Sequence, residues 1–255
     1  MASRRSNKRK RRRRGRFGFL YKLLSLAIIL VVVAAGCVVF FRVEEITVEG
    51  EGRYTAQEII DASGVELGDN LFLVNRAGTA QRIYTALSYV DNVSIRPALP
   101  DGLVIRITER SPAAVVQGGE GWWIIDKKGM ILEQAPSGTV EGLARVTGLT
   151  VLLPAVGTRV TVEDADALRL ESLLALLQAI ETWDMAAQVS EVDLTAAADL
   201  LMTYDGRFTV RIPMNADFNW KLRTLDGVMR ELQPNESGTI DLTREDEVRV
   251  IPNYG

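Results

Sequence analysis

The residues able to do chemistry in this 255-residue chain are few, because it contains no histidine and a single cysteine, Cys37. Hydrolysis needs a nucleophile beside a base, a metal cluster or a cleft with paired carboxylates. Without histidine, and with the only thiol inside an apolar segment, the serine–histidine, cysteine–histidine and histidine–zinc combinations are excluded. The pattern S-x-x-K is typical of enzymes with a serine–lysine dyad, and this pattern does not occur after residue 42.

Two residue pairs remain as candidates, and both have a simpler interpretation. Asp164 and Asp166 form a carboxylate pair, but they lie at a predicted helix start, where the helix dipole favours acidic side chains. Trp122 and Trp123 suggest sugar stacking, but neighbouring strand residues face opposite sides, so one in the core and one at a rim is favoured. We therefore expect no catalytic residue, no metal and no cofactor, and we expect that the chain is not an enzyme.

Charge is distributed unevenly along the sequence. Of the 30 basic residues, 11 lie in the first 22 positions, which contain no acidic residue. Residues 23–255 therefore contain 19 basic and 33 acidic residues and carry a net charge of −14. Between Lys22 and Arg42, the 19 residues from Leu23 to Phe41 carry no charge. As a helix this segment is about 29 Å long, enough to cross the hydrocarbon core of a bilayer.

An uncleaved membrane anchor at residues 23–41 is favoured over a secretory signal peptide. Signal peptides usually have a shorter apolar region, of about 7–15 residues, before a cleavage site of small residues. Residues 34–36 resemble such a site, but residues 38–41 continue the apolar run. Because basic residues beside a span stay in the cytoplasm, we expect a single-pass type II protein of the cell membrane with residues 1–22 as its cytoplasmic tail. The tail is expected to contact anionic lipid, and nucleic-acid binding is disfavoured.

The first region after the span has the predicted order strand, helix, helix, strand, strand. Residues 43–50 predict a strand, and the capping-box pattern from Thr55 to Glu58 predicts a helix that ends near Gly64. Apolar residues at 80, 83, 84 and 87 define one face of a second helix. Two strands, at 93–99 and 103–109, flank a Pro-Asp-Gly turn. The expected product is a small α+β domain with a three-stranded sheet backed by two helices.

The rest of the sequence predicts a larger, mixed β-rich region with two helices. The predicted strands are 113–117, 122–125, 130–133, 189–194, 199–204, 208–212, 238–243 and 247–251, with an irregular stretch at 136–157 and a hairpin signal at Asp205-Gly206. One helix is expected at about 163–183, with an apolar stripe of Leu170, Leu173, Leu174, Leu177 and Ile180. A second helix is expected after a capping Asp217.

Several short strings carry a resemblance to a known family. They lie at residues 43–50, 68–72, 87–96, 99–103 and 109–113, and include the pair Tyr89-Val90, the junction Glu109-Arg-Ser-Pro-Ala-Ala114 and the Asp-Lys-Lys-Gly hairpin ending at Gly129. Together with the order of elements, they resemble the FtsQ/DivIB family of bacterial division proteins. One departure is Ala98-Leu99, where relatives often have Trp-Pro.

The resemblance implies a transmembrane helix at 23–41, a POTRA domain at 43–111 and an FtsQ/DivIB-type β domain at 112–253. It also implies a non-catalytic scaffold of the divisome that lies at the division septum and helps to coordinate septal peptidoglycan synthesis. The implied partners are FtsL-like and FtsB/DivIC-like single-span division proteins.

The resemblance further implies where such a partner binds. In FtsQ-like proteins a partner adds a strand to the last part of the β domain, so that main-chain hydrogen bonds supply affinity and alternate side chains supply specificity. Carried onto this sequence, the partner-binding residues are Thr239, Ile240, Asp241, Leu242, Val248, Arg249, Val250 and Ile251, with Trp220 and Leu232 on the preceding helix. Which strand is the free edge does not follow from the sequence.

Two other functions stay open at this point. POTRA-like domains also occur in outer-membrane assembly and secretion factors, which continue into a long barrel of alternating strands that we do not expect here. The other alternative is a membrane-anchored cell-wall enzyme, against which the inventory of catalytic residue types argues.

Overall fold

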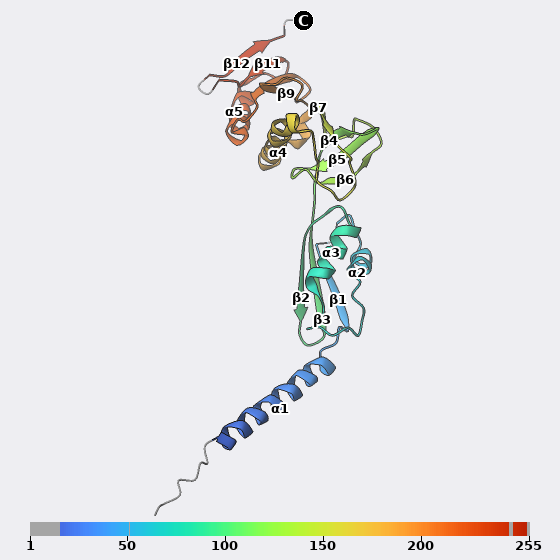
Figure 1. Cartoon of the computed structure of the whole chain (residues 1–255). Helices are drawn as coiled ribbons and strands as arrows, with labels where there is room; N and C mark the ends of the chain where they lie inside the picture. Colours follow the sequence, from blue (N-terminus) through green and yellow to red (C-terminus); the bar gives the residue numbers. More distant parts are fainter. Residues whose placement is uncertain (1–15, 51, 245–246, 254–255) are drawn as a thin grey trace, which may run out of the picture.

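The structure is a computed structural model that describes residues 16–50, 52–244 and 247–253, as an N-terminal helix followed by two sheets (Figure 1). Helix α1 (Arg16–Phe40) contains nearly all of the predicted span. Within the described residues, α1 is the one helix long and apolar enough to cross a membrane, and its most apolar stretch, Phe19–Gly36, is not covered by other parts of the chain. The predicted basic tail, up to Gly15, lies outside the described residues.

The first sheet and its two helices form the small domain. Its elements are β1 (Glu45–Glu49), α2 (Ala56–Ser63), α3 (Arg76–Ala86), β2 (Val90–Ala98) and β3 (Gly102–Glu109). The strand order is β1-β3-β2, with β1 parallel and β2 antiparallel to β3. Alternate residues of β3 are buried against Ile59 of α2 and Ile83 of α3, so the predicted α+β domain is confirmed.

The ends of α2 follow from the predicted local signals. The Thr55 side chain accepts a hydrogen bond from the Glu58 backbone N–H, and the Glu58 carboxylate accepts one from the Thr55 backbone N–H at 2.8 Å. The hydrogen bond from the Thr55 backbone, with that from its hydroxyl, lowers the pKa of Glu58. At the other end, Gly64 adopts the left-handed conformation with φ 60° and terminates the helix.

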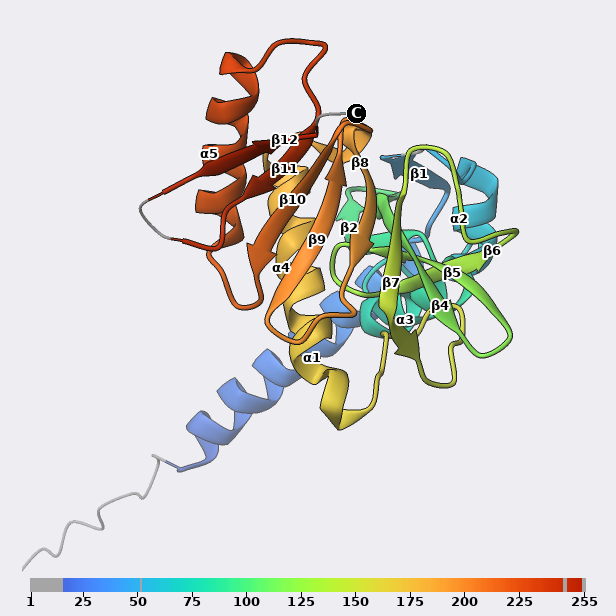
Figure 2. The ribbon, with the colours of Figure 1, turned by 90° about the horizontal axis from the view of Figure 1, so that it is seen from above.

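The second sheet and its helices form the large domain. Its elements are β4 (Pro112–Gly118), β5 (Gly121–Asp126), β6 (Ile131–Ala135), β7 (Ala144–Val151), α4 (Ala167–Thr182), β8 (Val189–Asp193), β9 (Asp199–Tyr204), β10 (Phe208–Pro213), α5 (Phe218–Glu231), β11 (Gly238–Asp241) and β12 (Arg249–Pro252). The strands form one twisted, mixed sheet in the order β12-β11-β10-β9-β8-β7-β4-β5-β6. Helices α4 and α5 contact one another beside the fan of strands β8 to β12 (Figure 2), and a single apolar core lies between them and the sheet.

Strand β7 corrects the sequence prediction, which treated residues 136–157 as irregular. Ala144 and Val146 are buried on one side of a bulge, and Leu149 and Val151 on the other, so the alternation of apolar residues skips one position at Gly148. Gly148 has φ 77°, and a Cβ there would lie 2.4 Å from the backbone nitrogen of Thr195. The bulge therefore hides the period of two that would have predicted the strand.

The buried face of α4 also differs from the predicted stripe. Leu173, Leu177 and Ile180 are buried as expected, but Leu176 is fully buried whereas Leu174 is only partly covered. The buried face of α4 is wider than the predicted stripe, because the helix packs against both the strands and α5.

A joint of aromatic and charged residues connects the two domains. The Tyr89 hydroxyl donates to Glu133 Oε1 at 2.6 Å, and the Arg53 guanidinium pairs with the same carboxylate at 3.1 Å while stacking over the Tyr89 ring. Behind them a small apolar cluster includes Trp122, whereas Trp123 packs against the main core of the large domain. The two tryptophans therefore face opposite sides of the sheet, as predicted, and both are partly buried.

Candidate functional site

The large sheet has two edge strands, β6 at one end and β12 at the other, and β12 is the one that lies beside the predicted partner-binding residues. Strand β11 has β10 as a parallel neighbour on one side and β12 as an antiparallel neighbour on the other. Within the described part of the chain, β12 pairs with β11 alone. Ile240 of β11 and Leu242, which follows β11, are buried in the core. Of the predicted partner-binding residues, 239–242 are therefore interior, whereas 249–251 lie in the edge strand and Val248 immediately precedes it.

The register of β12 fixes which of its backbone groups point outward. The Asn253 backbone N–H donates to Ser237 O at 2.9 Å, so this position is a hydrogen-bonded pair. Such pairs alternate along an antiparallel ladder, which makes Ile251 and Arg249 the bonded positions and turns the N–H and C=O of Val250 away from β11. Val250 therefore offers a donor and an acceptor at the edge. At the equivalent position two residues on, Pro252 offers a carbonyl only.

The two faces of β12 differ in polarity. Val248 and Val250 pack against the apolar core, on the side covered by α5, where they join Val228, Met229 and Leu232. Arg249 and Ile251 are exposed on the opposite face. A strand laid beside β12 would thus meet the apolar core margin on one face and the solvated side chains of Arg249 and Ile251 on the other.

A ladder of opposite charges crosses the exposed face toward the edge. Arg211 of β10 hydrogen-bonds to Asp199 through Nε at 2.8 Å, and it faces Asp241 of β11, which in turn faces Arg249 of β12. Partial burial opposes ionisation of Asp241, but hydrogen bonds from Thr243 and the two arginines lower its pKa below its ordinary value. The ladder therefore ends in a cation at the edge strand.

A hollow of about 610 Å³ opens at the start of α5. It is lined by Pro213, Met214, Asn215, Ala216, Asp217, Trp220, Lys221 and Thr243. Asp217 caps the helix as predicted, accepting the Trp220 N–H at 3.1 Å. The Lys221 side chain is buried and donates to Arg244 O at 2.8 Å, while Trp220 is 44% exposed, with its ring centre 4.7 Å from the Lys221 ammonium. The exposed indole thus stands beside the turn that leads into β12.

The predicted site residues are brought together at one end of the large domain. Trp220 lies near the start of β12, and Leu232, the residue that ends α5, packs on the same core as Val248 and Val250. The predicted neighbouring helix also brings Val228 and Met229 to this core, and the sequence prediction missed Pro252 as part of the strand. The proximity of Val228 and Met229 to β12 depends on the long-range pairing of β10 with β11.

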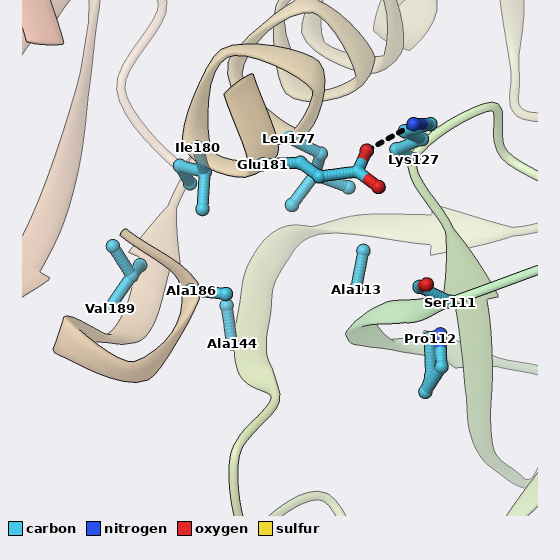
Figure 3. Close-up of a pocket in the computed structure, with 10 residues that line it drawn as sticks. All are labelled: Ser111, Pro112, Ala113, Lys127, Ala144, Leu177, Ile180, Glu181, Ala186 and Val189. Atoms are coloured by element: carbon cyan, nitrogen blue, oxygen red, sulfur yellow. Dashed lines mark ion pairs between the residues drawn. The ribbon is translucent and has the colours of Figure 1, made fainter. Parts of the chain in front are cut away.

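A smaller cavity, of about 140 Å³, lies between α4 and the strands β4 and β7 (Figure 3). Its walls are mostly apolar, with Ala113, Leu177 and Ile180 among them, and Ser111 supplies the only hydroxyl that lines it. Lys127, the one lysine among the residues that line the cavity, forms an ion pair with Glu181 (Figure 3), so its amine is engaged by a carboxylate. Within the described ranges no cluster of three or more metal-binding side chains occurs.

Comparison with known proteins gives matches along most of the chain. The family model for the FtsQ-type POTRA domain matches residues 41–110, and the model for the C-terminal domain of cell division protein FtsQ/DivIB matches residues 114–243. Cell division protein FtsQ of Corynebacterium glutamicum is 28% identical over 170 residues, which cover 64% of this chain and 76% of the relative. Cell division protein DivIB of Clostridium acetobutylicum is 26% identical over 204 residues, which cover 80% of each chain. Cell division protein FtsQ of Syntrophotalea carbinolica is 28% identical over 245 residues, 92% of this chain and 84% of the relative.

Proposed function

Because the chain belongs to the FtsQ/DivIB family of cell division proteins, we propose that it is a non-catalytic, membrane-anchored scaffold that binds a partner strand along β12. The proposed partners are FtsL-like and FtsB/DivIC-like single-span proteins of the divisome, and the proposed place of action is the division septum. The observation that carries the proposal is the open edge of β12, with the main-chain N–H and C=O of Val250 turned outward.

The proposed topology is that of a single-pass type II protein. Helix α1 would span the membrane, the basic residues before it would remain in the cytoplasm, and both domains would lie outside. The division of the chain into a tail at 1–22, a span at 23–41, a POTRA domain at 43–111 and a β domain at 112–253 belongs to the same proposal. The basic tail would contact anionic lipid at the inner surface of the membrane.

Binding at β12 would proceed by β-augmentation. An extended segment of the partner would pair with the outward groups of Val248 and Val250, and it would lose a donor at Pro252, which limits how far the added ladder runs. Its inward side chains would cover the apolar margin made by Val250 and Met229. The exposed Trp220 ring at the start of α5 would provide an aromatic anchor at one end of the added strand.

Two substitutions at one residue separate the main-chain contribution from the side-chain contribution. Val250→Pro removes the outward N–H without removing a hydrogen bond to β11, and Pro252 shows that the strand accommodates proline in the same phase. Val250→Ala shortens the side chain and keeps the N–H. The measurement is binding of the full chain, held in nanodiscs, to the extracytoplasmic part of its FtsB/DivIC-like partner.

We expect Val250→Pro to weaken binding at least tenfold, because it removes a main-chain hydrogen bond at the centre of the added ladder and leaves the partner carbonyl unpaired. Val250→Ala should weaken it only a few-fold. Equal effects of the two substitutions would contradict strand addition at this edge. Binding that neither substitution changes would remove β12 from the site, and the circular dichroism spectrum of each variant controls for unfolding.

A further inference from the structure

The exposed apolar side chains of the small domain are gathered at one end. Among its described residues, four large apolar side chains are exposed: Leu67 (68%), Phe72 (50%), Leu73 (69%) and Leu99 (62%). Three of them lie on the loop between α2 and α3, and Leu99 lies at the tip of the β2–β3 hairpin. We call these four residues the collar. The other end of the domain, which contacts the large domain, has no exposed side chain of this kind among the described residues.

Both loops of the collar are fastened to the residues that follow α1. The Val43 backbone N–H donates to Asp69 O at 2.8 Å, and the Leu71 N–H donates to Phe41 O at 3.0 Å. On the other side of the same segment, the Glu44 N–H donates to Asp101 O at 2.8 Å, which brings the hairpin tip to the start of β1. The collar therefore surrounds the point at which the chain leaves α1 (Figure 1).

This attachment leaves almost no linker between the helix and the domain. Helix α1 ends at Phe40, the Phe41 ring packs edge-on against Phe72 with ring centres 5.1 Å apart, and Val43 is fully buried. Three extended residues span about 10 Å at most. The interfacial layer on each side of a bilayer's hydrocarbon core is about 5–8 Å thick. A domain fastened this closely to a membrane-spanning helix must place its near end at the level of the lipid headgroups.

The loop that carries three of the collar residues has a defined shape. Leu71 is buried in the core of the domain, and the Asn70 side-chain oxygen accepts hydrogen bonds from the backbone N–H groups of Phe72 at 3.0 Å and Leu73 at 3.2 Å. These bonds hold the turn so that Phe72 and Leu73 project outward. Their exposure is therefore built into the loop and does not require it to unfold.

We propose that the collar inserts into the outer interface of the membrane that α1 spans, so that the small domain rests on the lipid bilayer. The occupant is the bilayer itself, because the short connection to α1 places the apolar side chains at the depth where such residues are stabilised by lipid. The charged residues close to the collar in the sequence are mostly acidic, namely Glu44, Glu66, Asp69 and Asp101, against the cations Arg42 and Arg76. Insertion should therefore depend on apolar contact and gain nothing from anionic lipid.

The proposal rests on the membrane insertion of α1, so the test reports on both separately. The full chain, with Cys37→Ser, is reconstituted into phosphatidylcholine vesicles and labelled at one new cysteine with an environment-sensitive fluorophore. The test variants are Leu73→Cys and Leu99→Cys. Thr85→Cys, exposed near the opposite end of the same domain, and Leu153→Cys, an exposed leucine of the large domain, are the matched controls. Val32→Cys reports whether α1 lies in lipid.

We expect blue-shifted emission and quenching by lipids that carry a nitroxide near the headgroup for the labels at positions 73 and 99. The labels at 85 and 153 should report water. If position 32 is in lipid while positions 73 and 99 behave like 85 and 153, the collar proposal fails and the anchor stands. If position 32 also reports water, the anchor fails, and the collar proposal fails with it.

A further variant tests the apolar nature of the contact. Leu73→Asp, combined with the label at position 99, should reduce the quenching at the hairpin tip, because a carboxylate at the loop opposes insertion of the whole collar. Replacing part of the phosphatidylcholine by anionic phosphatidylglycerol should not increase quenching of either label. An increase would show that headgroup charge rather than apolar insertion holds the domain, and would overturn the proposal.

Discussion

Arg110 links the last strand of the small domain to the large domain, and its loss should destabilise the connection between them. Its guanidinium pairs with Asp126 at 2.7 Å and with Asp91 at 3.2 Å, and its Nε donates to Val90 O at 3.0 Å. The substitution Arg110→Met keeps an unbranched apolar side chain and removes the charge and all three interactions. It leaves the carboxylate of Asp126 without its cation.

The expected loss of stability follows from the burial of the Arg110–Asp126 ion pair. The side chain of Arg110 is 11% exposed and that of Asp126 is 4% exposed, so solvent screens the pair poorly. Breaking a buried pair by removing one partner costs about 3–5 kcal/mol. Asp126 keeps hydrogen bonds from the backbone N–H groups of Lys128 at 2.8 Å and Met130 at 2.7 Å, which continue to compensate its charge. We therefore expect a loss near the lower end, about 3 kcal/mol.

The assay is equilibrium unfolding in urea of a chain that begins at Phe41. The stretch Phe19–Gly36 of α1 is not buried against the rest of the chain, so its removal uncovers no protein surface there. The matched control is Arg230→Met on α5, whose ion pair with Asp226 joins side chains that are 77% and 33% exposed. That pair should contribute only about 0.3–0.5 kcal/mol.

The double variant Arg110→Met with Asp126→Asn isolates the ionic term. Neutralising Asp126 removes the uncompensated charge and retains an oxygen that accepts the two backbone N–H groups, so the double variant should be more stable than Arg110→Met alone. The reasoning is refuted if Arg110→Met costs no more than Arg230→Met, or if Asp126→Asn adds its full cost to that of Arg110→Met.

Two further substitutions test the bulge and the joint. Gly148→Ala should destabilise the large domain by about 2–4 kcal/mol in urea unfolding, since a Cβ would lie 2.4 Å from Thr195 N at a positive φ, whereas Gly142→Ala, at the same φ but facing open space, should cost only about 1 kcal/mol; equal costs would contradict the steric argument. Burial, together with the hydrogen bond to Glu133, raises the pKa of Tyr89, so its contribution to stability is complete below the ordinary tyrosine pKa of 10.0 and is lost as pH rises above it. Glu133→Gln should lower the pKa of Tyr89, as measured by ultraviolet titration, and should therefore reduce the change in stability at alkaline pH. An unchanged Tyr89 pKa would show that burial alone raises it.

Local signals in the sequence predicted most elements of the fold. The capping box at Thr55, the cap at Asp217 and the turn at Asp205-Gly206 each act within a few residues, and each is present in the structure, where Asp205 and Gly206 both have positive φ. Strand β7 was missed for an equally local reason, because the bulge at Gly148 interrupts its alternation. Sequence periodicity is informative only where the backbone itself is regular.

The candidate site and the collar depend on contacts that no local pattern encodes. The edge position of β12 follows from the parallel pairing of residues 208–211 with 238–241, across the intervening helix. Similarly, within the apolar run at residues 71–74 only Leu71 is fully buried, because hydrogen bonds to Asn70 turn Phe72 and Leu73 outward. Arg110 lies in the junction from Glu109 to Ala114 on which the family resemblance partly rests. Its ion pairs with Asp91 and Asp126 could not be predicted from that string, because they depend on how the two domains pack.

The distance of the proposed binding edge from the membrane depends on two connections, one between α1 and the small domain and one between the two domains. In Figure 1 the strands β11 and β12 lie at the end of the large domain that is far from α1. On the proposed function, a single-span partner would have to carry its binding segment across the small domain to reach β12, for which a helix rising about 1.5 Å per residue is suited. The collar would fix the small domain to the bilayer, and the ion pairs of Arg110 and the Tyr89–Glu133 contact fix the large domain to the small one. If either connection were lost, the distance of β12 from the membrane would vary. Binding of the proposed partner would then be weakened by the entropic cost of fixing that distance.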